Sequence, residues 1–206
     1  MIQILGRANS INVQKVMWCA TELGLDIERL DLGGAFGGIE TAEFLSLNPN
    51  GQIPVLKDGE FVIWESNAIV RYLCQKYGKT SWVPECVMQQ GSAQQWMDWY
   101  LTTLHAPVST VFLQLIRTPI KERDPELMAT AHKRSVDLWT MIDAQLEGKS
   151  FLLGDRISMA DIPIGCAAYR WHALEIERPV LKNLERWYKK LSERHAFRSQ
   201  VMHPLT

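Results

Sequence analysis

The first 77 residues alternate between short apolar runs and stretches with helical periodicity. Residues 2–5 form an apolar run of strand length. Apolar residues between positions 13 and 23 then recur every three or four residues, which predicts a helix that Gly24 ends. Residues 27–32 have the composition of a second strand, so the segment predicts a βαβ unit with parallel strands.

A β-hairpin is predicted next, after a glycine-rich loop over residues 33–38 and a short helix near residues 41–46. Residues 54–57 and 60–63 read as strands joined by Asp58-Gly59, a strong hairpin signal. A helix with one apolar face follows, made by Ile69, Tyr72, Leu73 and Tyr77. The resulting order, βαβ-α-ββα, is that of a thioredoxin-like α/β domain.

From residue 87 onward the pattern contains no convincing strand and predicts an all-α domain. Three apolar helical faces carry this prediction: Ala93, Met97, Tyr100, Leu101 and Leu104; Leu138, Met141, Ile142 and Leu146; and Leu181, Leu184, Tyr188 and Leu191. We therefore divide the chain into an α/β domain (1–78), a linker (79–86) and a helical domain (87–206). Pro107 should bend or end the first long helix, because it has no N–H.

Residues 157–162 predict the start of a buried helix in the second domain. Ser158 can cap the helix, and Asp161 can reach back to the backbone N–H of Ser158, while Ile157 can contact Ile162 as a hydrophobic staple. This arrangement is structural, and we do not regard it as a functional site.

Composition narrows the class of protein. Of 206 residues, 47% are hydrophobic and 22% charged, which fits a globular chain, and the net charge of −1 argues against a nucleic-acid partner. No apolar run approaches the roughly 20 residues of a membrane span, so no membrane partner is expected. The first ten residues have no charged segment followed by a cleavage site, which favours a cytoplasmic location. The four cysteines and five histidines are scattered, which predicts buried reduced thiols and no metal.

With these elements in place, several spaced motifs show a family resemblance. They are Ser10 after the first strand, Asn-Pro-Asn-Gly-Gln-Ile-Pro at 48–54, Glu-Ser-Asn-Ala-Ile at 65–69, the capping box at Ser158, and the helix at 184–194. Over nearly its whole length the chain resembles the cytosolic glutathione transferases, and most of all their bacterial, theta-like branch with a serine at the catalytic position.

The resemblance implies a cis peptide bond between Ile53 and Pro54. Such a bond would turn the N–H and C=O of Ile53 outward, where the cysteinyl part of glutathione could pair with them like an added strand. The alternative is a trans proline at the start of a strand, which is an allowed position.

Glu65 and Ser66 stand where the hairpin ends and a helix begins. The hydroxyl and N–H of Ser66 would bind the α-carboxylate of the γ-glutamyl group, and Glu65 would pair with its ammonium. The alternative is plain helix capping, which is compatible with a ligand role. Gln52 and Asn67 are further candidates for glutathione binding.

Ser10 is the predicted donor to the glutathione sulfur. A free thiol has a pKa near 8.5, so an enzyme must favour the thiolate by about 2.7 kcal/mol to lower that pKa by about two units. A hydroxyl donor at a helix N-terminus can provide this preference. Ser10 can instead simply cap the helix; Asn12 is then the main rival as sulfur donor and Asn9 the third. Relatives with cysteine at this position act as thiol transferases, and that activity is not expected here.

The subsite for the glycine carboxylate of glutathione lacks the usual cation. Many members of the family use a basic residue after the second strand, but none occurs between Arg29 and Lys57. Backbone N–H groups of the loop at 33–38 can substitute. We therefore expect weaker glutathione binding than in a lysine-bearing relative.

A pocket for a small hydrophobic electrophile is expected between the two domains. Its candidate residues are Arg7, Trp96, Trp99, Tyr100 and His105, with Trp171 from a later helix. Aromatic residues at helical spacing are more often core than pocket, so each also has a purely structural interpretation.

The resemblance implies a homodimeric enzyme that conjugates glutathione, as co-substrate and without a metal, to an electrophile. Three alternatives use the same site: a glutathione-dependent dehalogenase, peroxidase or isomerase. A fourth is a non-catalytic binding or regulatory relative, and the presence together of Ser10, Ile53-Pro54 and Glu65-Ser66 argues against it.

Overall fold

The computed structural model describes residues 2–78, 82–84 and 86–206, and it divides into two compact units. The first contains Met1–Val83 and His195–His203, and the second contains Pro84–Arg194 and Pro204–Thr206. The linker predicted at 79–86 includes residues 79–81 and 85, which lie outside the described residues.

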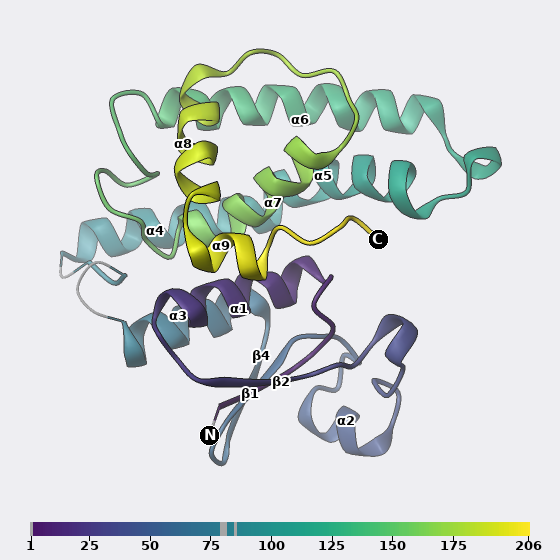
Figure 1. Cartoon of the computed structure of the whole chain (residues 1–206), viewed down its shortest axis with the longest axis vertical. Helices are drawn as coiled ribbons and strands as arrows, with labels where there is room; N and C mark the ends of the chain where they lie inside the picture. The colour runs from purple at the N-terminus through teal and green to yellow at the C-terminus, as the bar shows by residue number, and fades with distance from the viewer. Residues whose placement is uncertain (1, 79–81, 85) are drawn as a thin grey trace. The chain divides into compact units, whose positions relative to one another are not determined.

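The first unit is the thioredoxin-like α/β domain that the sequence predicts (Figure 1). Its sheet has the order β2-β1-β3-β4, with β1 parallel to β2 and the other pairs antiparallel. Its elements are β1 (Ile2–Leu5), α1 (Ile11–Glu22), β2 (Ile27–Leu30), η1 (Gly34–Phe36), α2 (Ala42–Leu47), β3 (Val55–Asp58), β4 (Phe61–Trp64), α3 (Ser66–Tyr77) and α9 (His195–Gln200).

Alternation along the strands gives the sheet two apolar faces. Ile4 pairs with Leu56, and both are fully buried on one face. The neighbouring pair, Leu5 and Val55, faces the other way and clusters with Phe44 of α2. Helices α1 and α3 contact each other, as Figure 1 shows, and their first turns lie near the candidate site described below.

The hairpin is confirmed, but its turn lies one residue later than predicted. Asp58 pairs with Phe61 as the last ladder position, so the turn residues are Gly59 and Glu60 instead of Asp58 and Gly59. The Asp58 carboxylate is held from α3, and these hydrogen bonds lower its pKa to about 2. The donors are Lys76 Nζ and the hydroxyls of Tyr72 and Tyr77. Binding to α3 explains why Asp58 stays in the strand.

Helix α9 packs with the first unit, although the sequence division assigns all residues after 87 to the helical domain. The ring of Phe197 meets Trp18 of α1 edge-on, with centroids 4.7 Å apart, and both side chains are fully buried. Gln14 Nε2 donates to the carbonyl of Val201 at 3.4 Å. Burial of these two aromatic rings accounts for the return of the C-terminal segment to the first unit.

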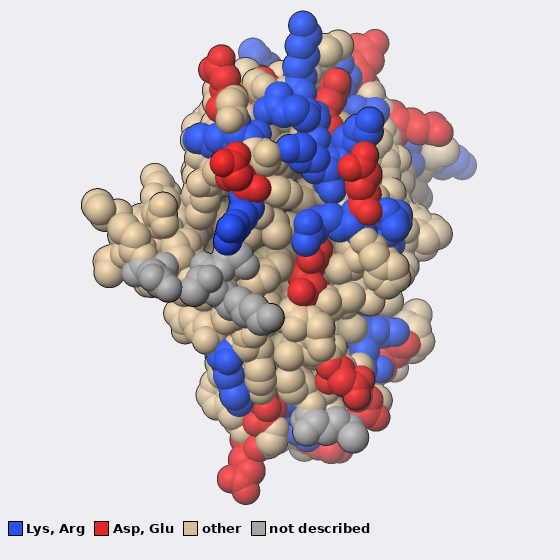
Figure 2. All heavy atoms as spheres, turned by 60° about the vertical axis from the view of Figure 1, so that its left-hand side comes forward, with Lys and Arg blue, Asp and Glu red and all other residues tan. Residues whose placement is uncertain are grey.

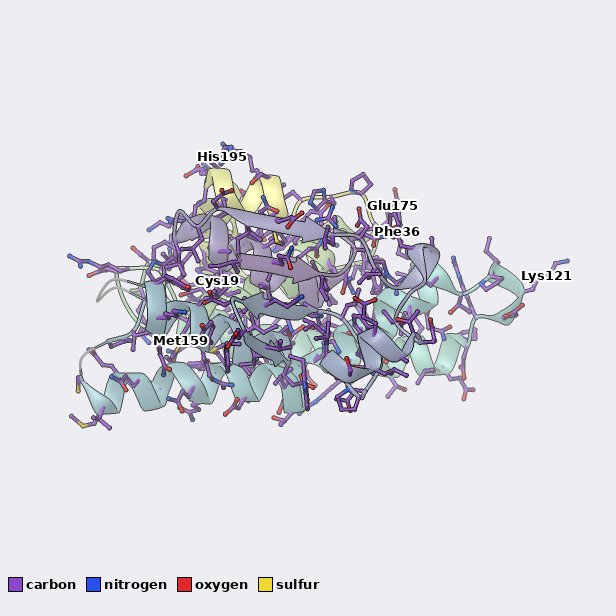
Figure 3. All side chains as sticks on the ribbon, turned by 90° about the horizontal axis from the view of Figure 1, so that it is seen from below. Cys19, Phe36, Lys121, Met159, Glu175 and His195 are labelled. Carbon is purple, nitrogen blue, oxygen red and sulfur yellow. The ribbon has the colours of Figure 1, made fainter. Side chains whose placement is uncertain are left out.

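The thiols are only partly as predicted. Cys19, labelled in Figure 3, lies on α1 with its Sγ 3.6 Å from that of Cys74 on α3. Both are buried, as is Cys166, and the hydrogen bond with Cys74 together with burial raises the pKa of Cys19. Cys86 differs from the prediction because it is exposed.

The second unit is helical, as predicted. Its elements are α4 (Val87–Trp99), the π-helical η2 (Tyr100–Leu104), α5 (His105–Phe112), the π-helical η3 (Leu113–Arg117), η4 (Ile120–Glu122), α6 (Pro125–Gln145), α7 (Asp161–Ala173) and α8 (Lys182–Ser192). Every residue of α7 from Asp161 to Trp171 is buried, so this helix forms the centre of the unit. Among the described residues, no helix combines the length and apolar character needed to cross a membrane.

Pro107 does not end the helical path. Helical winding continues from α4 through η2 into α5, in which Pro107 is the third residue. The wider π-helical turns of η2 lie directly before it, at the point where the proline cannot donate the usual backbone hydrogen bond. The prediction that the helix bends or ends here is therefore replaced by a local change of winding.

The predicted role of Asp161 is confirmed, while that of Ser158 differs. Asp161 Oδ2 accepts from the N–H of Ser158 at 3.0 Å, and also from the Ser158 hydroxyl, which therefore donates to the carboxylate instead of capping the helix. Asp161 Oδ1 accepts from the N–H of Leu152 and from Trp187 Nε1. Burial raises the pKa of the Asp161 carboxyl, and the four donated hydrogen bonds oppose that rise.

We expect Asp161→Ala to lower the free energy of unfolding by about 3 kcal/mol or more, because several buried donors would lose their acceptor. Chemical denaturation of the variant measures the change. Asp155→Ala is the matched control, since Asp155 is an exposed carboxylate in the preceding loop. Equal stability of the two variants would contradict this role for Asp161.

Candidate functional site

A pocket in the first unit brings together three segments that are distant in the sequence. It is lined by Asn12, Asn48, Asn50, Gln52, Ile53, Pro54, Glu65 and Ser66. Six of these are predicted site residues. The other two, Asn48 and Asn50, lie within the motif at 48–54 but are not predicted individually. Ser10 and Asn67 are predicted site residues that do not line the pocket.

The Ile53–Pro54 bond is cis, as the resemblance implies. Ile53 is half-buried and lines the pocket. Among the described residues, none forms a hydrogen bond with the N–H or C=O of Ile53. An extended peptide in the pocket can therefore pair with both groups as an added strand would.

Asn48 fixes the loop that carries Ile53. Its side chain is almost completely buried, and Nδ2 donates to the carbonyl of Gln52 at 2.7 Å. Its Oδ1 accepts from the N–H and the side-chain amide of Asn50. This asparagine therefore holds both sides of the turn that precedes the cis bond.

The N-terminus of α3 forms the opposite wall. Glu65 immediately precedes the helix and has φ 70°, the one non-glycine residue with positive φ among those described. Such a conformation is unfavourable for a side-chain-bearing residue and recurs at ligand sites. The Glu65 side chain is exposed and lines the pocket beside the N-terminus of α3, where the helix dipole favours negative charge.

Asn12 and Ser66, which line the pocket, form a hydrogen-bonded triangle with the buried Lys15. The Ser66 hydroxyl donates to Asn12 Oδ1 at 3.3 Å. Lys15 Nζ donates to Asn12 Oδ1 at 2.9 Å and to Ser66 Oγ at 3.4 Å. Lys15 is not among the predicted site residues, because a lysine is normally assigned to solvent. The available signal was its position on the same helical stripe as Ile11 and Trp18.

Ser10 precedes α1 as its N-cap residue, with extended backbone. Its side chain makes no capping hydrogen bond, so the capping interpretation of this serine is not observed. The main chain of Ser10 is fixed, because its carbonyl accepts from Gln14 N–H and its N–H donates to the carbonyl of Arg7. The hydroxyl is therefore available to a ligand, whereas Asn9 Oδ1 already accepts from the Arg7 guanidinium at 2.8 Å.

Arg7 lies against the glycine-rich loop at 33–38. A Cβ atom on Gly34 would come within 2.6 Å of Arg7 Nε, and Gly34 has φ +57°, so only glycine suits this position. Phe36, at the end of η1 and labelled in Figure 3, is 58% exposed. Arg7 thus places a positive charge beside this loop, which itself contains no basic residue.

The aromatic candidates lie in the second unit and differ in exposure. Trp96 and Trp99 are half-buried and meet edge-on at 5.2 Å, and Trp96 lines a cavity of about 430 Å³ together with residues of α4 and α6. Tyr100 is fully buried, and its hydroxyl lies 3.0 Å from His105 Nδ1. Trp171 is also buried and contacts the rings of His132 and Trp139.

Comparison with known proteins agrees with this geometry. Residues 2–75 match the family model of the glutathione S-transferase N-terminal domain, and residues 125–190 match that of the C-terminal domain. Glutathione S-transferase GstB of Escherichia coli is 38% identical over the full length of both chains. The chain belongs to the glutathione S-transferase family.

Solved structures of the family support the same assignment. A theta-class glutathione S-transferase from Xanthomonas axonopodis pv. citri, with glutathione bound, is 42% identical and has a TM-score of 0.96 over 100% of this chain and 99% of that one. Its apo form gives a TM-score of 0.87 over 100% of this chain and 98% of that one. The transferase fold therefore extends over the whole chain.

We expect Ser10→Ala to raise the pKa of a bound glutathione thiol by about one to two units, the value of one hydrogen bond to an anion. Asn12→Ala should weaken glutathione binding but leave that pKa nearly unchanged. Ultraviolet absorbance of the thiolate, followed against pH, measures both. Thiolate that persists in Ser10→Ala and disappears in Asn12→Ala would assign the sulfur donor to Asn12.

Proposed function

We propose that this protein is a transferase that joins the thiolate of glutathione to a small hydrophobic electrophile. The observation that carries the proposal is the pocket itself, in which the main chain of Ile53 is free to pair and Glu65 and Ser66 stand opposite. In this arrangement the cysteinyl group pairs with Ile53. The γ-glutamyl carboxylate binds at the first turn of α3, and its ammonium pairs with Glu65.

The Ser10 hydroxyl donates to the sulfur in this proposal. The thiol releases its proton to solvent, the sulfur–carbon bond forms, and the leaving group departs from the electrophile. Positioning of the two substrates and stabilisation of the thiolate supply the acceleration. Gln52, which lines the pocket, completes the glutathione subsite, and Asn67 is retained as a candidate because it follows Ser66 in the first turn of α3.

For the glycine carboxylate, we propose the loop at 33–38 with Arg7. The contact of Arg7 with Gly34 brings the guanidinium to the loop, and the backbone N–H groups there add further donors. This assignment competes with the earlier expectation that Arg7 lines the electrophile pocket. For that pocket Trp96, Trp99, Tyr100 and His105 are retained as candidates, and Trp96 has the most direct support because it lines a cavity.

We further propose a cytoplasmic homodimer with a detoxifying role. The four cysteines are in the free thiol form, which is usual in a reducing compartment. Two-fold dimers are the commonest oligomers, and exposed apolar residues near the start of α4, Val87 and Met88, offer surface for such a contact.

Titration calorimetry with glutathione, followed by a conjugation assay with an activated aryl halide, tests the proposal. We expect saturable binding and formation of a thioether with release of halide. Glu65→Gln should weaken glutathione binding by about tenfold, because one charge-assisted contact is lost, while the affinity for the aryl halide is unchanged. Glu60→Gln, in the hairpin turn, is the matched control. Absence of glutathione binding in the unmodified protein would refute the proposal.

A further inference from the structure

Lys15 is a fully buried cation in the first unit. It lies on α1 between the buried side chains of Ile11 and Trp18. On the face drawn in Figure 2, Lys and Arg side chains extend into solvent, with acidic residues among them. Removing an ammonium from water is costly unless nearby groups accept its hydrogen bonds, as Asn12 Oδ1 and Ser66 Oγ do here.

The contacts of Lys15 determine how two pocket residues are oriented. An ammonium can only donate hydrogen bonds, so the atom of Asn12 at 2.9 Å from Nζ must be the oxygen. The same oxygen accepts from Ser66 Oγ at 3.3 Å. The side-chain NH₂ of Asn12, a residue that lines the pocket, is thereby directed away from Lys15.

The location of Lys15 also affects the electrostatics of the pocket. Ser66 is the first residue of α3, so its Oγ, 3.4 Å from Nζ, places the ammonium beside the positive end of that helix. Two positive groups next to each other repel, and an anion bound in the pocket relieves the repulsion. The wall formed by Asn12 and Ser66 is therefore suited to a carboxylate.

We propose that Lys15 is a positioning residue for the α-carboxylate of the γ-glutamyl group, an inference that rests on the proposed function. When the carboxylate binds, the Ser66 hydroxyl turns its hydrogen from Asn12 to the ligand. Lys15 continues to donate to Asn12 Oδ1, so the amide keeps its orientation. The buried charge of Lys15 adds attraction for the carboxylate without contacting it.

A purely structural lysine makes a different prediction. If Lys15 only fills space between α1 and α3, its loss should weaken all ligands of the pocket to the same extent. If it acts on the carboxylate, its loss should weaken ligands that carry this charge more than ligands that lack it. Comparing glutathione with its analogue in which the γ-glutamyl α-carboxylate is a carboxamide separates the two.

The experiment measures the dissociation constants of both ligands for the unmodified protein, Lys15→Met and Lys57→Met. Methionine has similar length and no charge, and Lys57 on β3 provides a lysine in the same unit that does not line the pocket. We expect the unmodified protein and Lys57→Met to prefer glutathione to the carboxamide. In Lys15→Met this preference should fall by about tenfold, the effect of one charge interaction of moderate strength.

A ratio of the two dissociation constants that is the same in Lys15→Met as in the unmodified protein would overturn the inference. Should Lys15→Met fail to fold, Lys15→Gln replaces it, because glutamine keeps a donor for Asn12 and removes the charge; the same ratio then decides. An unmodified protein that binds neither ligand would refute the proposed function and this inference with it. Binding of both ligands with no effect of Lys15 on the ratio would refute the inference alone.

Discussion

The contact between α1 and α3 is the constraint on which the candidate site depends. Two contacts show how these helices run. Asn12 meets Ser66 near the start of both helices, and Cys19 meets Cys74 further along. Because the contacts follow the same order in each helix, α1 and α3 are parallel and their N-termini lie together. The positive ends of two helices, with Ser10 before one and Glu65 before the other, therefore lie close together.

The site is built in two layers with different tasks. The lining of the pocket consists mostly of short polar side chains and the main chain of Ile53. Among them, Asn48 holds the loop before Pro54, and behind them the buried Lys15 holds Asn12. Buried hydrogen bonds of this kind keep pocket residues in place before a ligand arrives, which reduces the ordering required on binding. The unfavourable backbone of Glu65 is tolerated within this fixed surrounding.

Much of this arrangement was predictable because it depends on local pattern. Alternation and helical spacing predicted the order of strands and helices along the first domain, including the parallel pair β1–β2 and helix α3, and the family resemblance implied the cis bond. The features that were missed depend on contacts between distant segments. The hairpin turn shifts because Asp58 binds side chains of α3, and α9 joins the first unit because Phe197 meets Trp18. Lys15 was not predicted because a lysine is normally assigned to solvent, even on the apolar stripe that it shares with Ile11 and Trp18. The roles of Ser10 and the aromatic residues remain predictions.

In the proposed complex, glutathione lies extended along Ile53 with its sulfur directed at Ser10. A crystal structure of the protein with glutathione tests this most directly. The account predicts that the cysteinyl N–H and C=O pair with the main chain of Ile53, with the sulfur within hydrogen-bond distance of Ser10 Oγ. Glutathione bound elsewhere, or a sulfur that contacts the Asn12 amide while Ser10 stays apart from it, would contradict the account.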